Sequence, residues 1–568
     1  MPPKKRAKVE ESILERAWQH YRNFVDSCDD DEEGIVEELQ SIIDLVPDVL
    51  PASDLLSNRH DLLPILISMC HYQIAANLIS QSLDTEVDVD RDIMKHLQNS
   101  LTLFPMNCAS WSIGANYARI HNVVSSTTTL QWYEKAANFA SALRGKALAL
   151  LEDDLADEDT KEWLEMLILN AMLGVEYLVP EEIDVEGVEE DLEFEEDLGF
   201  FSTSAVESTA RFMCAMLSSS LGNHERCLDH IRHFDVTHRL HPNVWKQRVD
   251  ESTHEGPVLF SGNILPETLY NAICHTFSPE ACYWKESDYN HRGYHSYFIS
   301  TSCDPSNLIE EVIVNHLLPL AKQCYDGDEE IVGAEWWPHH RPIQANLGHN
   351  LHFDTDEAML QQENVITHPV LSSVLYLTTG GKGLAGPTIV LDQNPDSQEV
   401  ATKCWTCSPE DNTFLLFDGS LLHGVLPCPG ERRLETNTSN DGDIMYWEKK
   451  ASRIDLPHRL TFMVGFWTRN VPEKIKNRRE YGPCGPLPSS DSNKWVQSVL
   501  TFSKSIPPTK NLVKTFLPTI TPAWERIEAS EGEKLSIPQA IDHRFFVKGA
   551  PECFRNALFE DHEEDISS

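Results

Sequence analysis

Positive charge is scarce in this chain. Its 568 residues include 46 Lys and Arg against 90 Asp and Glu, which gives a formal net charge of -44 at pH 7. Such a field repels phosphate backbones, so we expect no general binding of nucleic acids. The excess of acids leaves room for a local basic groove, but it excludes a protein that is basic over its whole surface.

Long apolar runs are also lacking, and the cysteines do not follow the spacing of a disulfide framework. No uninterrupted apolar window of about 18 residues occurs, so we expect no membrane-spanning helix and no membrane partner. The N-terminus, MPPKKRAKVEES, has no apolar segment of the secretory type, which predicts that the protein is not secreted. The 14 cysteines are scattered, which indicates reduced thiols inside a cell. For the single Cys-x-x-Cys, Cys404 to Cys407, we favour a turn beside a strand over a redox or zinc role.

A short basic cluster stands at the start of this acidic chain. Lys4, Lys5, Arg6 and Lys8 follow two prolines within residues 1–12, which we expect to be disordered. The cluster resembles a monopartite nuclear localisation signal, which an importin reads by charge on an extended segment. This predicts a nuclear protein with importin as a partner. The alternative is an ordinary charged terminus on a cytoplasmic protein.

Residues 13–250 have the pattern of helices. Apolar residues recur at steps of three and four, and residues 181–197 hold an acidic run that reads as a linker or insert. Two helical hairpins are expected, within 101–140 and 210–234, and small residues would let their helices approach closely. They loosely resemble tetratricopeptide repeats, with a generic helical bundle as the alternative. Residues 551–568 form an acidic tail.

The pattern changes to strands in residues 258–550. A strand, a helix and an aromatic-rich turn come first, and Asn307 to Tyr325 is expected to be one amphipathic helix. Short strands punctuated by Gly and Pro then predict a sheet sandwich or barrel. The chain as a whole is therefore expected to be a multidomain α+β protein.

A metal-ligand pattern lies among these strands. His352 and Asp354 are two residues apart, so on a strand their side chains face the same way. His423 follows in a second strand, after a turn at Asp418-Gly419. Two histidines and one carboxylate form the facial triad that holds Fe(II) and leaves positions open. His349 has the wrong parity to share a strand face with His352, and we expect His339, His340 and His368 to be structural or surface residues.

A buried cation is expected on the strand RLTFMVGFW. Its parity puts Arg459, Thr461 and Met463 on one face and Leu460, Phe462, Val464 and Phe466 on the other. A guanidinium with a hydroxyl two residues on suits a carboxylate. Arg432 and Arg433, in the polar segment between His423 and Arg459, are rivals for the same role.

These segments together resemble the Fe(II)/2-oxoglutarate-dependent dioxygenases, in particular the prolyl-hydroxylase-like group, over residues 258–470. The resemblance implies a double-stranded β-helix, or jelly roll. It also implies Fe(II) on His352, Asp354 and His423, 2-oxoglutarate as cosubstrate anchored by Arg459 and Thr461, and ascorbate as an auxiliary cofactor. The turn at Gly386-Pro387-Thr388 parallels one in that group, and for Tyr376 we favour a core position over contact with the keto acid from the neighbouring strand.

The activity implied is hydroxylation of a protein side chain, with succinate and CO₂ as products. One alternative is a Jumonji-type demethylase or hydroxylase, which usually anchors the cosubstrate with lysine. A nucleic-acid demethylase is disfavoured by the net charge. A third alternative is a non-enzymatic helical scaffold that carries a degenerate dioxygenase fold, and the intact triad argues against it.

Overall fold

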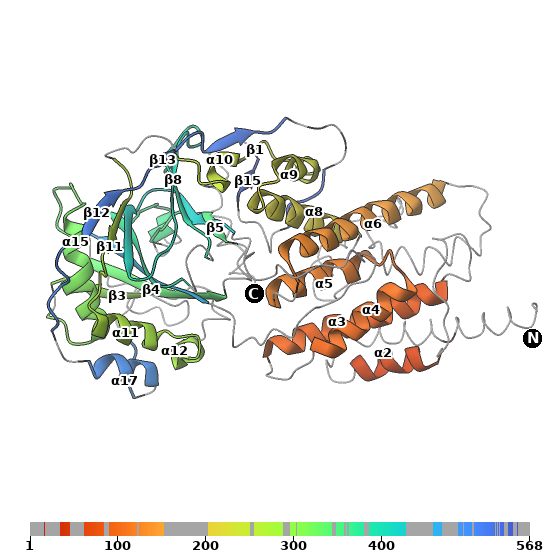
Figure 1. Cartoon of the computed structure of the whole chain (residues 1–568), viewed down its shortest axis with the longest axis horizontal. Coiled ribbons are helices and arrows are strands. Elements are labelled where there is room, and N and C mark those ends of the chain that lie inside the picture. Colours follow the sequence, from red (N-terminus) through yellow and green to blue (C-terminus); the bar gives the residue numbers. More distant parts are fainter. Residues whose placement is uncertain are drawn as a thin grey trace, which may run out of the picture.

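The molecule combines a helical part with a β-rich part (Figure 1). The computed structural model describes residues 16, 35–45, 62–84, 90–121, 124–152, 203–249, 255–287, 296–302, 304–342, 348–356, 359–360, 363–379, 385–427, 458–468, 487–491, 493–502, 505–528, 530, 532, 534–538, 544–548 and 554. The basic N-terminal cluster, the acidic run at 181–197, the segment with Arg432 and Arg433, and the tail beyond 554 lie outside the described residues.

The helical part is a packed set of long helices. They are α2 (Ile35–Asp44), α3 (Leu62–Asp84), α4 (Asp90–Leu103), α5 (Cys108–His121), α6 (Ser126–Glu152), α8 (Thr203–Ser220) and α9 (His224–Ile231). One apolar cluster runs through α2 to α8, and fully buried alanines such as Ala115, Ala136 and Ala137 let α5 and α6 pack closely. Helices stabilised this way depend mainly on tertiary burial rather than on their own propensity.

Both expected hairpins form. The first is α5 and α6, and the second is α8 and α9, joined at Leu221-Gly222-Asn223, where Gly222 has a φ of +78° and Asn223 caps α9 by accepting from the Arg226 N–H. Membership of a tetratricopeptide array stays a prediction.

One window, Leu63–Ser80 in α3, is long and apolar enough to cross a membrane, but 61% of it is buried within the protein. A core helix of a folded domain passes the same test of length and hydropathy, and it is buried to this extent.

Two antiparallel sheets form the β-rich part (Figure 1). The larger has seven strands in the order β12 (Val513–Phe516), β2 (Val258–Ser261), β9 (Thr413–Asp418), β6 (Leu371–Thr378), β11 (His458–Trp467), β4 (Gly333–Pro342) and β3 (Tyr297–Ser300). The smaller has five in the order β13 (Thr519–Ile520), β8 (Cys404–Cys407), β7 (Thr388–Leu391), β10 (His423–Val425) and β5 (His349–His352).

The chain alternates between the two sheets. From β4 to β11 it goes to the smaller sheet for β5, returns for β6, leaves for β7 and β8, returns for β9, and leaves again for β10 before β11. Side chains from both sheets meet in one apolar cluster, which includes Tyr376, Val390, Trp405 and Phe417. The sheets therefore face each other as a sandwich.

Helices cover the outer face of the larger sheet. They are α11 (Glu267–Thr276), α12 (Cys282–Glu286), α14 (Leu308–Glu310), a π-helix (Glu311–Leu317), α15 (Leu318–Lys322) and α17 (Lys494–Leu500), and their apolar side chains share one core with the outward residues of β11. The expected helix from Asn307 to Tyr325 is thus interrupted by a π-helical segment. Pro319 accounts for it, because a proline ring offers no N–H and clashes with the carbonyl four residues earlier.

A third sheet joins the two parts. Its strands are β1 (His238–Leu240), flanked by β14 (Trp524–Arg526) and β15 (Phe546–Val547). The apolar cluster around it contains Phe212 of α8, Leu351 of β5 and Phe546 of β15, so helices and sandwich share a core. The chain beyond the sandwich returns to the helical part, which makes the two parts one packed unit.

The Cys404–Cys407 segment is a buried strand, β8, rather than the expected turn beside a strand. Cys404 belongs to the cluster shared with the helices, and Cys407 to the cluster between the sheets. Residues three apart on a strand point to opposite faces, so the two thiols cannot bind one zinc ion or form a disulfide with each other.

Candidate metal centre and pocket

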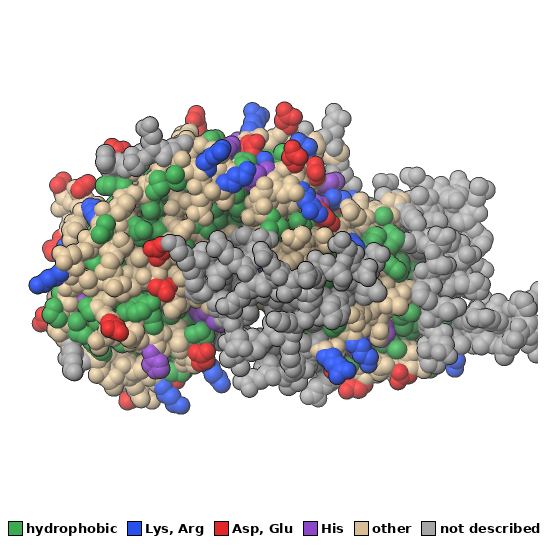
Figure 2. Space-filling model, in the orientation of Figure 1, with side chains coloured by type: hydrophobic (Ala, Val, Ile, Leu, Met, Phe, Trp, Pro, Cys, Tyr) green, Lys and Arg blue, Asp and Glu red, His purple; other side chains and the backbone are tan. Residues whose placement is uncertain are grey.

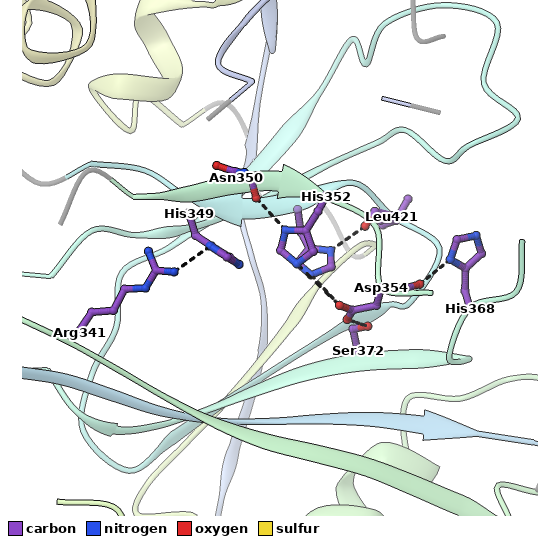
Figure 3. Close-up of polar contacts among 9 residues, drawn as sticks. Arg341, His349, Asn350, His352, Asp354, His368, Ser372 and Leu421 are labelled. Atoms are coloured by element: carbon purple, nitrogen blue, oxygen red, sulfur yellow. Dashed lines mark hydrogen bonds and ion pairs between the residues drawn. The ribbon is translucent and has the colours of Figure 1, made fainter. Parts of the chain in front are cut away.

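His352, Asp354 and His423 come together inside the sandwich, and Figure 3 shows His352 and Asp354 pointing toward each other. His352 ends β5, His423 begins β10, and the two are direct partners across the antiparallel pair. Asp354 lies in the loop that follows β5, so it reaches the same point after the strand has ended. The Nε2 atoms of His352 and His423 lie 3.8 Å and 3.6 Å from Oδ1 of Asp354. These separations are too long for hydrogen bonds, and they match ligands spaced around an ion at about 2.0–2.2 Å.

Backbone carbonyls fix both imidazoles. Nδ1 of His352 donates to the Asn350 carbonyl at 2.7 Å, and Nδ1 of His423 donates to the Leu421 carbonyl at 2.9 Å. A carbonyl oxygen only accepts, so the proton is on Nδ1 and the lone pair is on Nε2. Ser372 Oγ donates to Oδ2 of Asp354 at 2.5 Å, which orients the carboxylate. Outer contacts of this kind hold ligands ready for a metal.

Burial and mutual charge shift the pKa values of the three groups. Burial and then the charge of His423 lower the pKa of His352 to about 4. For Asp354, burial alone would raise the pKa, but the charges of His423 and His352 hold it well below the usual range. For His423 the opposing effect of burial is outweighed by Asp354, so its pKa is raised. Near neutral pH the site therefore offers an ionised carboxylate and a neutral His352, the forms that bind metal.

The cluster opens into a pocket between the sheets. Its atom-free space, including the part open to solvent, is about 660 Å³, within the range of small-molecule sites. Among the described residues that line it, Asp354 is the only acid, against two arginines. The lining is Trp337, His339, Arg341, Gly348, His349, His352, Asp354, Ser373, Val374, Thr388, Phe417, His423, Gly424, Val425, Arg459, Thr461 and Met463.

One wall of the pocket is a ladder of cross-strand pairs between β4 and β11. Met463 faces Trp337, Thr461 faces His339 and Arg459 faces Arg341. The alternate residues of β11, from Leu460 to Phe466, enter the core under the helices, as parity predicts. The strand thus presents Arg459 and Thr461 to the pocket.

Arg459 is prepared for an anion. It is 7% exposed, it donates to Thr388 Oγ1 at 3.1 Å, and its Nε has no hydrogen-bond partner. Tyr376 donates to the same Thr388 oxygen at 2.7 Å. Burial lowers the pKa of Arg459, and the charge of Arg341 adds to this effect while Tyr376 and Cys407 oppose it. A buried guanidinium without a carboxylate is costly, so this position favours an acidic ligand.

His349 was expected to face away from His352, and this is wrong. Both line the pocket, and their ring centroids lie 4.8 Å apart. The pairing explains it: His352 faces His423 and His349 faces Val425, so β5 carries one more residue than β10 over this stretch. A β-bulge of this kind reverses the parity of the residues beyond it. Arg341 and His339 also line the pocket. Their position follows from their pairing with Arg459 and Thr461 on β11, which the sequence of β4 alone does not reveal.

The remaining histidines fit the expectation of structural roles, His339 apart. Nδ1 of His368 contacts the backbone carbonyl of Asp354 at 2.7 Å and so supports the loop. His340 points away from the pocket, where its Nε2 lies 2.6 Å from Nδ1 of His458 and its ring is tilted against Trp284.

The comparisons with known proteins find no matching family model and no matching curated protein. Among solved structures, the chain is similar to a prolyl-4-hydroxylase of Pseudomonas putida, at 16% identity and a TM-score of 0.22, over 38% of this chain and 88% of that one. It is also similar to HygX of Streptomyces hygroscopicus, at 10% identity and a TM-score of 0.21, over 40% of this chain and 92% of that one. One HygX structure holds nickel and 2-oxoglutarate, and another holds iron. These identities and scores are too low to assign a function.

Proposed function

We propose that the chain is an Fe(II)- and 2-oxoglutarate-dependent dioxygenase. The observation that carries the proposal is the convergence of two imidazole Nε2 lone pairs and one carboxylate, each held by an outer hydrogen bond, on one point of a pocket. Two neutral nitrogens and one anionic oxygen suit Fe(II) and leave coordination positions open. The bound metal would activate O₂ with the keto acid, which would leave as succinate and CO₂.

The residues around the metal support a dicarboxylic keto acid as cosubstrate. Thr388, Val425 and His349 form one row across the smaller sheet, and Val390, His423 and His352 form the next. The rows are two residues apart along β10, which is roughly 7 Å. A short diacid bound to the metal at one row would bring its far carboxylate to Arg459, which contacts Thr388 in the other.

The strand order supports a double-stranded β-helix. Eight strands, β4 to β11, divide into β9-β6-β11-β4 and β8-β7-β10-β5, with the chain alternating between them. In this reading the jelly roll carries the chemistry, and the helical part packs against it through the shared core. An anchor at Arg459 would differ from the lysine usual in the Jumonji type, and it would differ equally from the lysine of the collagen-type prolyl hydroxylases.

For the substrate we propose a protein side chain. The helical hairpins beside the sandwich would suit an extended peptide, and acidic and basic side chains are interspersed over the face seen in Figure 2 rather than gathered into one basic surface.

We further propose nuclear import through Lys4 to Lys8. Deleting residues 2–8 should leave the protein cytoplasmic, and an unchanged nuclear fraction would refute the signal.

Succinate release is the decisive test. The purified protein should convert 2-oxoglutarate to succinate when Fe(II) and O₂ are supplied, slowly alone and faster with a substrate. Asp354→Asn should abolish the reaction, whereas His340→Asn, on the outer face of β4, should retain it. Equal succinate formation by the wild-type protein and Asp354→Asn would contradict the proposal.

A further inference from the structure

His349 lies beside the metal cluster but is not part of it. Its ring lines the pocket and lies 4.8 Å from the ring of His352, yet the group that could hold an ion consists of His352, Asp354 and His423. A bulge in β5 is needed to turn this side chain inward. The feature that sets its chemistry is its neighbour Arg341.

Arg341 determines which nitrogen of His349 carries the proton. One terminal nitrogen of the guanidinium lies 3.1 Å from His349 Nδ1 (Figure 3). Arginine has only donors, so Nδ1 must accept, and the neutral ring then has its hydrogen on Nε2. The other terminal nitrogen donates to the Gly348 carbonyl at 2.8 Å. Arg341 therefore holds two consecutive residues of the β5 segment.

Gly348 is required for this clamp. Its φ of +97° is in the region that favours glycine, and a Cβ there would lie 2.2 Å from the Val425 carbonyl oxygen. The close approach lets the chain turn into β5 with its carbonyl toward Arg341. The orientation of His349 is thus built by backbone and side chain together.

The free edge of His349 faces the site. In Figure 3 the ring extends from Arg341 toward the side of the pocket where His352 lies. A nitrogen that carries a hydrogen cannot coordinate a metal, so Nε2 is a donor directed at whatever binds there. The one acid of the described lining, Asp354, already accepts from Ser372 and faces the two ligand histidines.

We propose that His349 donates a hydrogen bond from Nε2 to the carboxylate that a 2-oxo acid places on the metal, and that Arg341 is the positioning residue that keeps His349 in this tautomer. The role rests on the proposed function. It differs from the anchoring of the far carboxylate by Arg459, because it acts at the metal end of the ligand.

The test measures binding rather than turnover. The affinity of Mn(II) is determined first, and then the affinity of 2-oxoglutarate for the Mn(II)-loaded protein, both by calorimetry. His349→Phe should weaken 2-oxoglutarate by about 10- to 100-fold, the effect of losing one hydrogen bond to a charged group. Its Mn(II) affinity should stay within about threefold, which also shows that the site has folded. His349→Gln, which keeps a donor, should recover most of the loss.

A double-mutant cycle separates positioning from direct contact. Arg341→Met should weaken 2-oxoglutarate in the wild-type background and have no further effect in His349→Phe. An equal loss in both backgrounds would mean that Arg341 binds the ligand itself, which overturns the positioning role. His340→Asn, a histidine on the outer face of β4, serves as the matched control and should bind normally.

The outcomes also separate this role from the proposed function. A wild-type protein that binds Mn(II) but no 2-oxoglutarate would overturn both together. A wild-type protein that binds both, with His349→Phe equally able to bind 2-oxoglutarate, would overturn the role of His349 alone.

Discussion

Buried charges are treated in opposite ways in the helical part and in the pocket. In the helical part Glu207, which is 1% exposed, pairs with Arg211 at 2.7 Å and with Arg144 at 3.0 Å. In the pocket, the buried Arg459 faces the partly buried Arg341 on the neighbouring strand, and Arg459 contacts the Thr388 hydroxyl rather than an acid. Like charges directly opposite one another destabilise a sheet.

The polar groups repeat this contrast. Ser68, Ser100, Asn107 and Ser110 form a closed network of buried hydrogen bonds in the helical part. At the pocket, Arg459 Nε is left without a partner. Satisfied groups specify a structure, whereas unsatisfied ones mark the place where a ligand is needed. We infer that the unsatisfied Arg459 in the pocket marks the place where an anion completes the site.

The largest expected effect is on metal binding. His352→Ala removes one of three ligands and leaves the other two with open positions, so Fe(II) or Mn(II) affinity should fall by far more than the roughly 10- to 100-fold that loss of an outer contact to a ligand costs. Calorimetric metal titration checks it. The matched change His368→Ala removes a contact to the backbone of Asp354 but no ligand atom, so it should have a much smaller effect. Full affinity in His352→Ala would show that the triad is not the metal site.

The next effect concerns stability. Glu207→Ala leaves two arginines without their buried partner, so the free energy of unfolding should fall by about 3–5 kcal/mol. Urea denaturation measures it, with the exposed Glu225→Ala as control, for which we expect less than about 1 kcal/mol. A loss as small as the control would mean that the helical charges are no better paired than those of the pocket.

Arg459→Met should show the reverse pattern. The 2-oxoglutarate affinity of the Mn(II)-loaded protein should fall on the order of a hundredfold, equivalent to about 3 kcal/mol, because the anion loses its buried partner. The free energy of unfolding of the ligand-free protein should fall little or even rise, since an unpaired buried cation is removed. Arg432→Met and Arg433→Met are the comparison variants. Normal binding by Arg459→Met together with loss in either comparison would move the anchor to that segment.

The smallest effect is a pH dependence in the helical part. Burial and then the charges of His96 and Lys95 lower the pKa of His71 to about 4, below the 6.5 expected when unfolded. The unfolded chain thus binds a proton that the folded chain excludes. This contribution to stability is present above pH 6.5 and is lost as the pH falls toward 4, by roughly 1–3 kcal/mol. His71→Asn should flatten the decline in unfolding free energy. An unaltered decline would assign it to other groups.

Local pattern was sufficient for several features. The period of two along a strand predicted that Arg459, Thr461 and Met463 share a face, and the structure places all three in the pocket. The spacing of His352 and Asp354, with His423 after a turn, was likewise enough to predict a cluster that forms. Helical periodicity predicted the hairpins α5 to α6 and α8 to α9. Each of these rests on neighbours in the chain.

Other features needed the tertiary structure, because they depend on which residues meet across strands. A bulge created by pairing β5 with β10 turned His349 into the pocket, and strand register placed Arg341 opposite Arg459. Burial on both faces made Cys404 to Cys407 a strand rather than a turn. The sequence by itself determined the ligands of the candidate metal centre, since their spacing is local. Only the fold decided that Arg341 and His349 line the pocket, because parity beyond a bulge and pairing between strands are not written in any single segment.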